Sequence, residues 1–290
     1  MNKFIENINR VYPDLIIKEY YVNEIGQNND VIVVNESLVF RFPKYNQGIL
    51  QLRRETDILK YIEDKVSLQT PVPVYKSFDE LETGKVFTGY QLIEGKPLWR
   101  KSLLEIKNDN QVRGLASQLA SFLTALHSIS GETASRELQL ELIHPRKEII
   151  DLYEKIEKRL FPFMRKESQE ELTESFKNFL TGEALSNLNL SLIHGDFGAS
   201  NILWKQETIE ISGIIDFGGS GVGDPAYDFA GILSSYGEEF FNRCIDQYPN
   251  GYEIAKRVQF YRSTFALQEA LHGIENDDLL AFEAGIKNYR

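Results

Sequence analysis

Three polar residues lie at a fixed spacing between Ser191 and Asp228, in a stretch that is otherwise mainly apolar and glycine-rich. Asp196 is followed by four residues and then by Asn201, and Asp216 opens an Asp-Phe-Gly run further along the chain. This spacing is typical of phosphoryl transfer, in which one carboxylate lies near the attacking hydroxyl. The stretch therefore predicts a phosphoryl-transfer centre.

The residue types indicate different roles within such a centre. Hard oxygen ligands hold Mg²⁺, which bridges the phosphates and neutralises their charge, and Asn201 and Asp216 supply such oxygens. Asp196 has no metal partner within the motif, so it is better suited to orient the substrate hydroxyl and to accept its proton. We assign Asp196 as the catalytic residue and the other two as metal ligands.

A hairpin is expected to position these groups. Residues 202–204 have the pattern of a short strand, residues 205–207 that of a turn, and Ile209 to Ile215 that of the returning strand, with alternate residues on one face. Such a hairpin would bring Asn201 and Asp216, at its two open ends, close together.

Three motifs of this stretch resemble one known family. His-Gly-Asp-Phe-x-x-x-Asn, Ile-Ile-Asp-Phe-Gly and Asp-Pro-x-x-Asp-Phe are similar to the motifs of the aminoglycoside phosphotransferases, which are small-molecule kinases. The run from Val39 to Lys44 looks most like the branch that modifies a 2″-hydroxyl, and the resemblance covers nearly the whole chain. It implies an α+β, two-lobed, protein-kinase-like fold. Residues 1–94 would form a nucleotide-binding lobe of antiparallel sheet plus helix, and residues 95–290 a larger, mainly helical catalytic and substrate-binding lobe.

Composition and net charge limit the classes of binding partner that the protein can have. The 290 residues include 32 basic and 43 acidic ones, a net charge of −11, which argues against non-specific nucleic-acid binding and is compatible with a cationic small molecule. One cysteine, Cys244, excludes an internal disulfide and a cysteine-based zinc cluster. No signal peptide or membrane-length apolar run is visible, so we expect a cytoplasmic protein. Nothing in the sequence demands a dimer, and we expect a monomer.

The resemblance also implies nucleotide contacts in the N-terminal part. The turn from Glu24 to Asp30, with Gly26 and Asn28, would cover the phosphates, although an ordinary hairpin loop would look the same. Arg41 stands where kinases carry the phosphate-binding lysine of the third strand. We assign it that role and keep Lys44, which is expected to point to solvent, as the reserve.

Further nucleotide contacts follow from the same resemblance. Glu55, in a helix predicted over residues 47–65, would pair with the basic residue of the third strand, unless it is a solvated side chain beside other charges. Residues 91–95 would form the hinge, where the base hydrogen-bonds to the backbone of Gln91, Leu92 and Ile93. Tyr90 would flank the base or simply fill the core.

The C-terminal part is expected to be mostly helical. Residues 112–126 carry a strong apolar stripe at helical spacing, and His127 after them is predicted to be a buried structural histidine. Asp224 is expected to cap a helix before Pro225, and Asp228 to brace the catalytic loop. Helices expected at residues 147–160 and 170–180 would help to wall the substrate cleft in the resembling enzymes.

Substrate contacts are the least determined by the sequence. Glu238, Glu239 and Glu269 are predicted to face the ammonium groups of an aminoglycoside, and a solvated acidic surface is the alternative. Ser234 and Ser235 follow the helix of Asp228 at a place where the similar family branch tends to be acidic.

The predicted function is Mg²⁺-dependent transfer of the γ-phosphoryl group of ATP or GTP to a hydroxyl of an aminoglycoside antibiotic, which would confer resistance. Alternatives are a kinase of a macrolide, an amino sugar or a choline-like metabolite, and a non-catalytic nucleotide-binding homologue. A protein kinase is disfavoured, because only seven residues separate Asp216 from Asp224, too few for an activation loop.

Overall fold

The computed structural model describes residues 2–23, 29–186 and 188–290, and it divides the chain into two compact units. Residues 1–126 and 200–220 make up the first, called the sheet unit here, and residues 127–199 and 221–290 make up the second, called the helical unit. The predicted lobe boundary between residues 94 and 95 is a division of function and stays a prediction. Within the three described ranges, no helix is long and apolar enough to cross a membrane.

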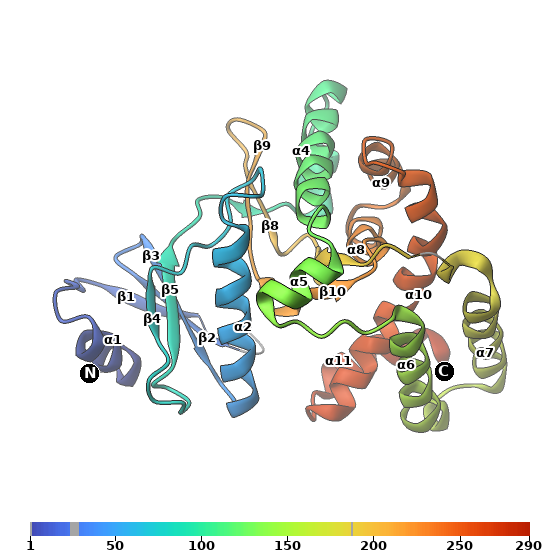
Figure 1. Ribbon diagram of the computed structural model, residues 1–290, viewed down its shortest axis with the longest axis horizontal. Helices are drawn as coiled ribbons and strands as arrows, with labels where there is room; N and C mark the ends of the chain where they lie inside the picture. The colour runs from blue at the N-terminus through green and yellow to red at the C-terminus, as the bar shows by residue number, and fades with distance from the viewer. Residues whose placement is uncertain (1, 24–28, 187) are drawn as a thin grey trace. The chain divides into compact units, whose positions relative to one another are not determined.

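The sheet unit is built on a five-stranded antiparallel sheet with the strand order β1-β2-β3-β5-β4 (Figure 1). Its described helices and strands are α1 (Lys3–Val11), β1 (Tyr20–Asn23), β2 (Asn29–Val34), β3 (Leu38–Pro43), α2 (Asn46–Ile62), β4 (Tyr75–Ser77), β5 (Phe87–Gln91), β6 (Lys96–Pro97), α3 (Arg100–Glu105), α4 (Asp109–His127), β8 (Ile202–Lys205), β9 (Glu210–Ile214) and the short 3₁₀ helix η3 (Phe217–Gly219). The last residue of α4 belongs to the helical unit.

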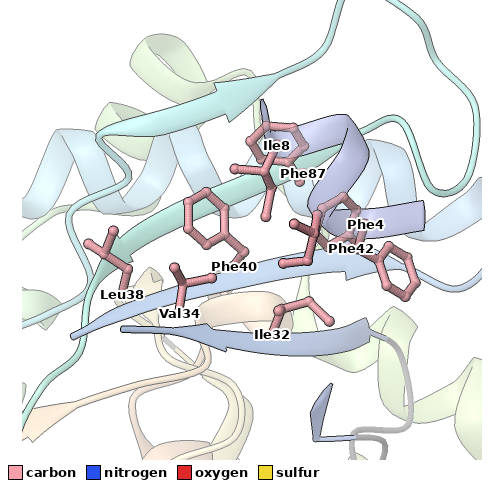
Figure 2. Packing of buried hydrophobic residues seen from close by; sticks show 9 residues of the cluster. Phe4, Ile8, Ile32, Val34, Leu38, Phe40, Phe42 and Phe87 are labelled. Atoms are coloured by element: carbon pink, nitrogen blue, oxygen red, sulfur yellow. The ribbon is translucent and has the colours of Figure 1, made fainter. Parts of the chain in front are cut away.

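Strand alternation gives the sheet two different faces. The even-numbered residues of β3, Leu38, Phe40 and Phe42, pack with Ile32 and Val34 of β2 against helix α1. Figure 2 shows Phe4 and Ile8 of α1 lying over these side chains. Because side chains alternate along a strand, the odd-numbered residues of β3 face the other way, towards the side of α2. This alternation places the charged Arg41 on the α2 side of the sheet.

Helix α2 presents a buried stripe that contains one charge. Leu52, Glu55 and Leu59 lie three and four residues apart, so they share one face of the helix, and all three are buried. An unpaired carboxylate in such a stripe would be strongly unfavourable. Glu55 must therefore meet a cation from the sheet.

The predicted hairpin is present, with one difference at its turn. β8 and β9 pair antiparallel, and β6 adds a third strand beside β8. Ile209 was predicted to begin the returning strand, but it lies in the turn with φ 55°, and β9 begins at Glu210. The longer turn, together with a bulge between Leu203 and Trp204, shifts the alternation that a simple two-strand pattern would give.

The helical unit contains one two-stranded antiparallel sheet, β10-β7, among helices. Figure 1 shows the long helix α10 beside α8 and α11. The helices predicted at residues 147–160 and 170–180 are present as α6 and α7. The described helices and strands of the helical unit are α5 (Gly131–Leu138), α6 (Pro145–Arg159), α7 (Lys166–Thr181), β7 (Ser191–Ile193), β10 (Gly221–Gly223), α8 (Ala226–Tyr236), α9 (Glu238–Ile245), α10 (Gly251–Glu275) and α11 (Leu279–Ile286), with short 3₁₀ helices at 161–163, 183–185 and 287–289.

A matched pair of leucines tests the packing of the sheet unit. Leu38 is 5% exposed in the cluster beneath α1, whereas Leu50 of α2 is 66% exposed. Leu38→Ala is expected to lower the free energy of unfolding by about 2–5 kcal/mol, because it removes buried methyl groups and leaves a cavity. Leu50→Ala is expected to change it by less than about 0.5 kcal/mol. Urea unfolding followed by circular dichroism measures both, and equal losses would contradict this packing.

Candidate active site

Arg41 joins two carboxylates within the sheet unit. Its Nη1 donates a short hydrogen bond to Glu55 Oε1 of α2, and its Nη2 donates to Asp216 Oδ1 at 2.9 Å. Arg41 and Glu55 are buried, whereas the side chain of Asp216 is 49% exposed. A guanidinium can hold two acceptors at once because its donors form a fixed fork. The pair predicted from the resemblance, Arg41 with Glu55, is therefore present, and it also holds Asp216.

Burial and charge act in opposite directions on this group. Burial disfavours the Arg41 cation, but the carboxylates of Glu55 and Asp216 outweigh it, so the pKa of Arg41 is raised and the charge is secure. Burial raises the pKa of Glu55, and the charge and hydrogen bond of Arg41 oppose that rise. The three side chains form one electrostatic unit on the α2 side of the sheet.

Lys44, the reserve phosphate contact, lies in a different setting. Its Nζ is 3.9 Å from Asp30 Oδ1, and both side chains are about one-quarter exposed. It is thus ion-paired on the surface rather than simply pointing to solvent. The structure connects Arg41, and not Lys44, to Asp216.

The hairpin brings the two predicted metal ligands to neighbouring positions. Ile202 pairs with Ile214, and just beyond this pair the backbone N–H of Ile215 donates to the carbonyl of Asn201 at 2.9 Å. Asp216 follows directly in the left-handed conformation, with φ 63° and ψ 70°. This conformation is unusual for a residue other than glycine and is often found at functional sites.

Asn201 and Asp216 suit a magnesium ion by their chemistry. Both offer hard oxygen atoms, and Mg²⁺ prefers one or two protein ligands together with phosphate oxygens and water. Among the described residues, no group of three or more His, Cys, Asp or Glu side chains is placed to hold a metal ion by itself. The donor set therefore fits a magnesium ion that is bound together with a nucleotide.

Gln51 is a contact that sequence reasoning missed. Its Nε2 donates to the carbonyl of Gly218 at 2.8 Å, which ties helix α2 to the 3₁₀ turn after Asp216. An exposed glutamine in a helix carries no sequence signal for such a partner.

The predicted base-binding residues lie on and after β5. Tyr90 is paired with Val39 across the sheet and is buried against it, and burial raises the pKa of Tyr90 to about 12. Leu92 N donates to the carbonyl of Ser37 at 2.8 Å, and Gln91 and Leu92 are exposed while Ile93 is buried. Their contact with a base stays a prediction. Gly26 and Asn28 of the predicted phosphate turn lie outside the described residues.

In the helical unit, Asp196 sits on a loop that follows β7. Gly195 before it has φ 79°, a conformation that glycine adopts without strain. Asp196 N donates to His194 Nδ1 at 3.2 Å, and Gly198 N donates to the carbonyl of Asp196 at 2.9 Å. The backbone of Asp196 is thus held in a tight turn while the residue itself is exposed.

Asp228 of α8 braces this loop, as predicted. Its Oδ2 accepts from His194 N at 2.8 Å and lies 3.0 Å from His127 Nε2, and its Oδ1 accepts from Gly195 N at 2.8 Å. Burial by itself would raise the pKa of Asp228, but the hydrogen bond of His127, the neighbouring imidazoles and the backbone N–H of His194 outweigh it. The net pKa of Asp228 is lowered, so the buried carboxylate stays ionised.

The other nitrogen of His127 is also engaged. Its Nδ1 lies 3.1 Å from the hydroxyl of Tyr248, and the histidine is 7% exposed. The prediction of a buried structural histidine at this position is confirmed.

Asp224 caps helix α8 and also forms an unpredicted ion pair. Its Oδ1 accepts from Ala226 N at 3.0 Å, as expected of a cap before Pro225. Arg257 of α10 donates from Nε to Oδ2 at 2.5 Å and from Nη2 to Oδ1 at 2.8 Å. This bidentate pair joins α8 to α10, and no local pattern connects two residues so far apart in the sequence.

A pocket of about 320 Å³ opens beside Asp196 within the helical unit. That volume lies at the lower end of the range of small-molecule pockets, which is about 300–1,000 Å³. The lining combines residues of the Asp196 loop with residues of α8 and α10, namely Gly195, Asp196, Phe197, Gly198, Tyr227, Gly231, Ser234, Ser235, Phe265 and Gln268.

The family follows from the similarity of this chain to known proteins. The model of the APH phosphotransferase enzyme family matches residues 22–264. The chain belongs to this family.

Two phosphotransferases are similar over almost the full chain. Viomycin phosphotransferase of Streptomyces vinaceus is 28% identical over an alignment that covers 98% of this chain and 96% of that protein. The GDP and kanamycin complex of APH(2'')-IIIa is 27% identical with a TM-score of 0.89, covering 99% of this chain and 96% of that one. The gentamicin complex of APH(2'')-IIa, at 23% identity and a TM-score of 0.82, shows the same fold.

These findings confirm the resemblance drawn from the motifs and the predicted α+β, kinase-like fold. This phosphotransferase is an enzyme with a hydroxyl group as phosphoryl acceptor.

The predicted acidic substrate contacts of the phosphotransferase are not gathered at the pocket. Glu238, Glu239 and Glu269 are exposed and none of them lines it, and Glu239 instead pairs with Arg243 one turn along α9 at 3.0 Å. Their contact with a substrate stays a prediction. Gln268, the neighbour of Glu269, is the α10 residue that faces the pocket.

The two serines also lie differently from the expectation. Ser234 and Ser235 belong to the last turn of α8 rather than following the helix, and both line the pocket. The helix runs to Tyr236 because its end is set by Gly237, which has φ 85°.

The buried charge of Asp228 predicts a pH-dependent stability. Asp228→Asn would turn one of its acceptor oxygens into a donor facing N–H groups, and it should lower the free energy of unfolding by about 2–4 kcal/mol at pH 7. Since the folded-state pKa lies below the unfolded value of about 3.9, this stabilisation is present above that pH and is lost as pH falls through the folded-state pKa.

Urea unfolding of both proteins from pH 7 down to about pH 3 would measure the effect. The gap between wild type and variant should narrow below about pH 4. Asp246→Asn, an exposed carboxylate after α9, is the control. A gap that is the same at both ends of the range would contradict the ionised state of Asp228.

Proposed function

We propose that this phosphotransferase moves the γ-phosphoryl group of ATP or GTP, with Mg²⁺, to a hydroxyl of an aminoglycoside antibiotic. The observation that carries the proposal is the exposed carboxylate of Asp196 in the wall of a pocket, on a backbone held by Asp228. The substrate class is supported by the complex of APH(2'')-IIIa with GDP and kanamycin.

A second acceptor is favoured by a separate finding. The similar protein from Streptomyces vinaceus is a viomycin phosphotransferase, and its identity of 28% is no lower than that of APH(2'')-IIIa. Viomycin therefore belongs in the same test as the aminoglycosides.

The proposed nucleotide site uses the sheet unit. Arg41 is the side chain that grips the phosphates, with Glu55 holding it in place, and Tyr90 to Ile93 flank and hydrogen-bond the base. Residues 1–94 would be the nucleotide-binding lobe and residues 95–290 the catalytic and substrate-binding lobe. Bound at Asn201 and Asp216, Mg²⁺ would supply positive charge to the transferring phosphoryl group.

The proposed transfer step is direct. Asp196 aligns the acceptor hydroxyl and accepts its proton as the hydroxyl oxygen forms a bond to the γ-phosphorus. The bond between that phosphorus and the bridging oxygen breaks, and the nucleoside diphosphate leaves with the electron pair. Positioning and charge stabilisation supply most of the rate. We further propose that the enzyme works as a monomer in the cytoplasm, where nucleoside triphosphates are available.

Phosphoryl transfer from ATP and from GTP, with and without Mg²⁺, to kanamycin, gentamicin, streptomycin, viomycin and a macrolide tests the proposal. Asp196→Asn should reduce kcat by about 10²–10⁴-fold, the usual contribution of a general base, while nucleotide affinity changes by less than about twofold. Asp246→Asn should keep wild-type turnover. Nucleotide binding without transfer to any acceptor would instead favour a non-catalytic homologue, and wild-type turnover by Asp196→Asn would refute the mechanism.

Arg41 and Lys44 can be separated by a matched pair of variants. Arg41→Lys keeps the charge but cannot reach Glu55 and Asp216 together, so the KM for the nucleotide should rise by about tenfold to a hundredfold, as for a lost hydrogen bond to a charged group. Lys44→Met should change it by less than about twofold. Steady-state kinetics with varied nucleotide give both values, and the reverse order would assign the phosphates to Lys44.

A further inference from the structure

Helix α8 presents three special residues on one face. Asp228, Gly231 and Ser235 are three and four residues apart, a spacing that aligns them along one side of a helix. Each of the three contacts one segment, the catalytic loop from His194 to Ala199.

The two ends of that loop are hydrogen-bonded to the two ends of this face. Asp228 accepts the N–H groups of His194 and Gly195, each at 2.8 Å. Ser235 Oγ accepts the N–H of Ala199 at 3.0 Å. The two anchors lie about two helical turns apart, so the loop runs along the helix between them.

The middle of the loop lies directly against Gly231. A Cβ added at Gly231 would lie 2.4 Å from the carbonyl oxygen of Phe197 and 2.9 Å from its carbonyl carbon. Backbone atoms cannot swing aside as a flexible side chain does, so no larger residue fits unless the loop or the helix moves. The absent side chain is what lets the loop lie on the helix.

Together with the turn at Asp196, these contacts fix most of the loop's backbone donors. The N–H groups of Asp196 and Gly198 are bonded within the loop, to His194 Nδ1 and to the carbonyl of Asp196. The N–H groups of His194, Gly195 and Ala199 are bonded to side chains of α8. The carboxylate of Asp196 is thereby presented from a backbone that is held on both sides.

We propose that Ser235 and Gly231 are positioning residues of the phosphoryl transfer, which seat the far end and the middle of the catalytic loop on α8 and so set the position of Asp196. Asp228 seats the near end. The proposal rests on the role assigned to Asp196 under the proposed function. It assigns no contact with the acceptor to Gly231.

The proposal predicts a specific kinetic pattern. Ala199 is buried, so removing the hydroxyl of Ser235 leaves its N–H without that partner and lets the end of the loop move. A displaced general base lowers the rate of the chemical step more than it lowers binding. Ser235→Ala should therefore reduce kcat by about tenfold while the KM for nucleotide and for acceptor each change by less than about twofold.

Two further serine variants sharpen this test. Ser235→Thr retains a hydroxyl at the same carbon and should recover most of kcat. Ser263→Ala is the matched control, because Ser263 is also a helical serine, on α10, whose hydroxyl is bonded only to the carbonyl of Phe260 among the contacts described. It should leave kcat unchanged.

A second matched pair tests the glycine. Gly231→Ala should lower kcat by about a hundredfold, because the loop itself has to shift. Gly114→Ala, in the middle of α4, meets nothing within 4 Å and should leave kcat unchanged, while stabilising the helix by relieving the cost of glycine.

Hydrogen–deuterium exchange of the peptide covering residues 194–200 gives a readout that does not depend on turnover. Exchange should be faster in Ser235→Ala and Gly231→Ala than in wild type, and unchanged in Ser263→Ala and Gly114→Ala. Circular dichroism melting of all variants checks that they are folded at the assay temperature.

Each result supports or overturns the proposal. Wild-type kcat and exchange in folded Ser235→Ala and Gly231→Ala would overturn it. A raised acceptor KM with unchanged kcat in Ser235→Ala would overturn it too, because Ser235 would then contact the acceptor. If the wild-type enzyme transferred phosphate to no acceptor, the proposed function would fail, while faster exchange in the variants would still support the seating of the loop.

Discussion

The constraint on which the helical unit depends is the buried charge of Asp228. A carboxylate without solvent must have its oxygens paired, and here its partners are two backbone N–H groups of the catalytic loop and the ring of His127. Because the carboxylate of Asp228 must be paired, it holds the first residues of the loop, His194 and Gly195, against α8. The same need fixes the end of α4, because His127 is also held from its other side by Tyr248.

In the sheet unit the buried charge that must be paired is a cation, Arg41. Arg41 projects from the buried strand β3 and is neutralised by Glu55 inside and Asp216 towards the surface. Because the first pairing is buried and the second is partly exposed, Asp216 is the member that a ligand can reach. A buried ion pair and a partly exposed carboxylate thus share one guanidinium, which a lysine with its single nitrogen could not supply in the same way.

Both units place their candidate site carboxylates on irregular backbone that regular elements hold in position. Asp216 adopts a left-handed conformation shortly after strand β9. Asp196 directly follows Gly195, which also has a positive φ. Such turns expose a side chain at a defined point, and they hold their shape only if neighbouring elements bind their backbone groups. Gln51 binds a backbone carbonyl of the turn after Asp216, and Asp228 of α8 binds a backbone N–H of the loop that carries Asp196.

The sequence by itself determined the elements whose signals are local. Alternation predicted the hairpin, and helical periodicity predicted α4. Motif spacing predicted Asp196, Asn201 and Asp216 as site residues, and the resemblance of the motifs indicated the family. The tertiary structure alone decided which distant groups meet: Ala199 with Ser235, 36 residues apart, and Gln51 with Gly218, 167 residues apart. Such pairs carry no periodicity, and each depends on how whole helices pack, so no local pattern could indicate them.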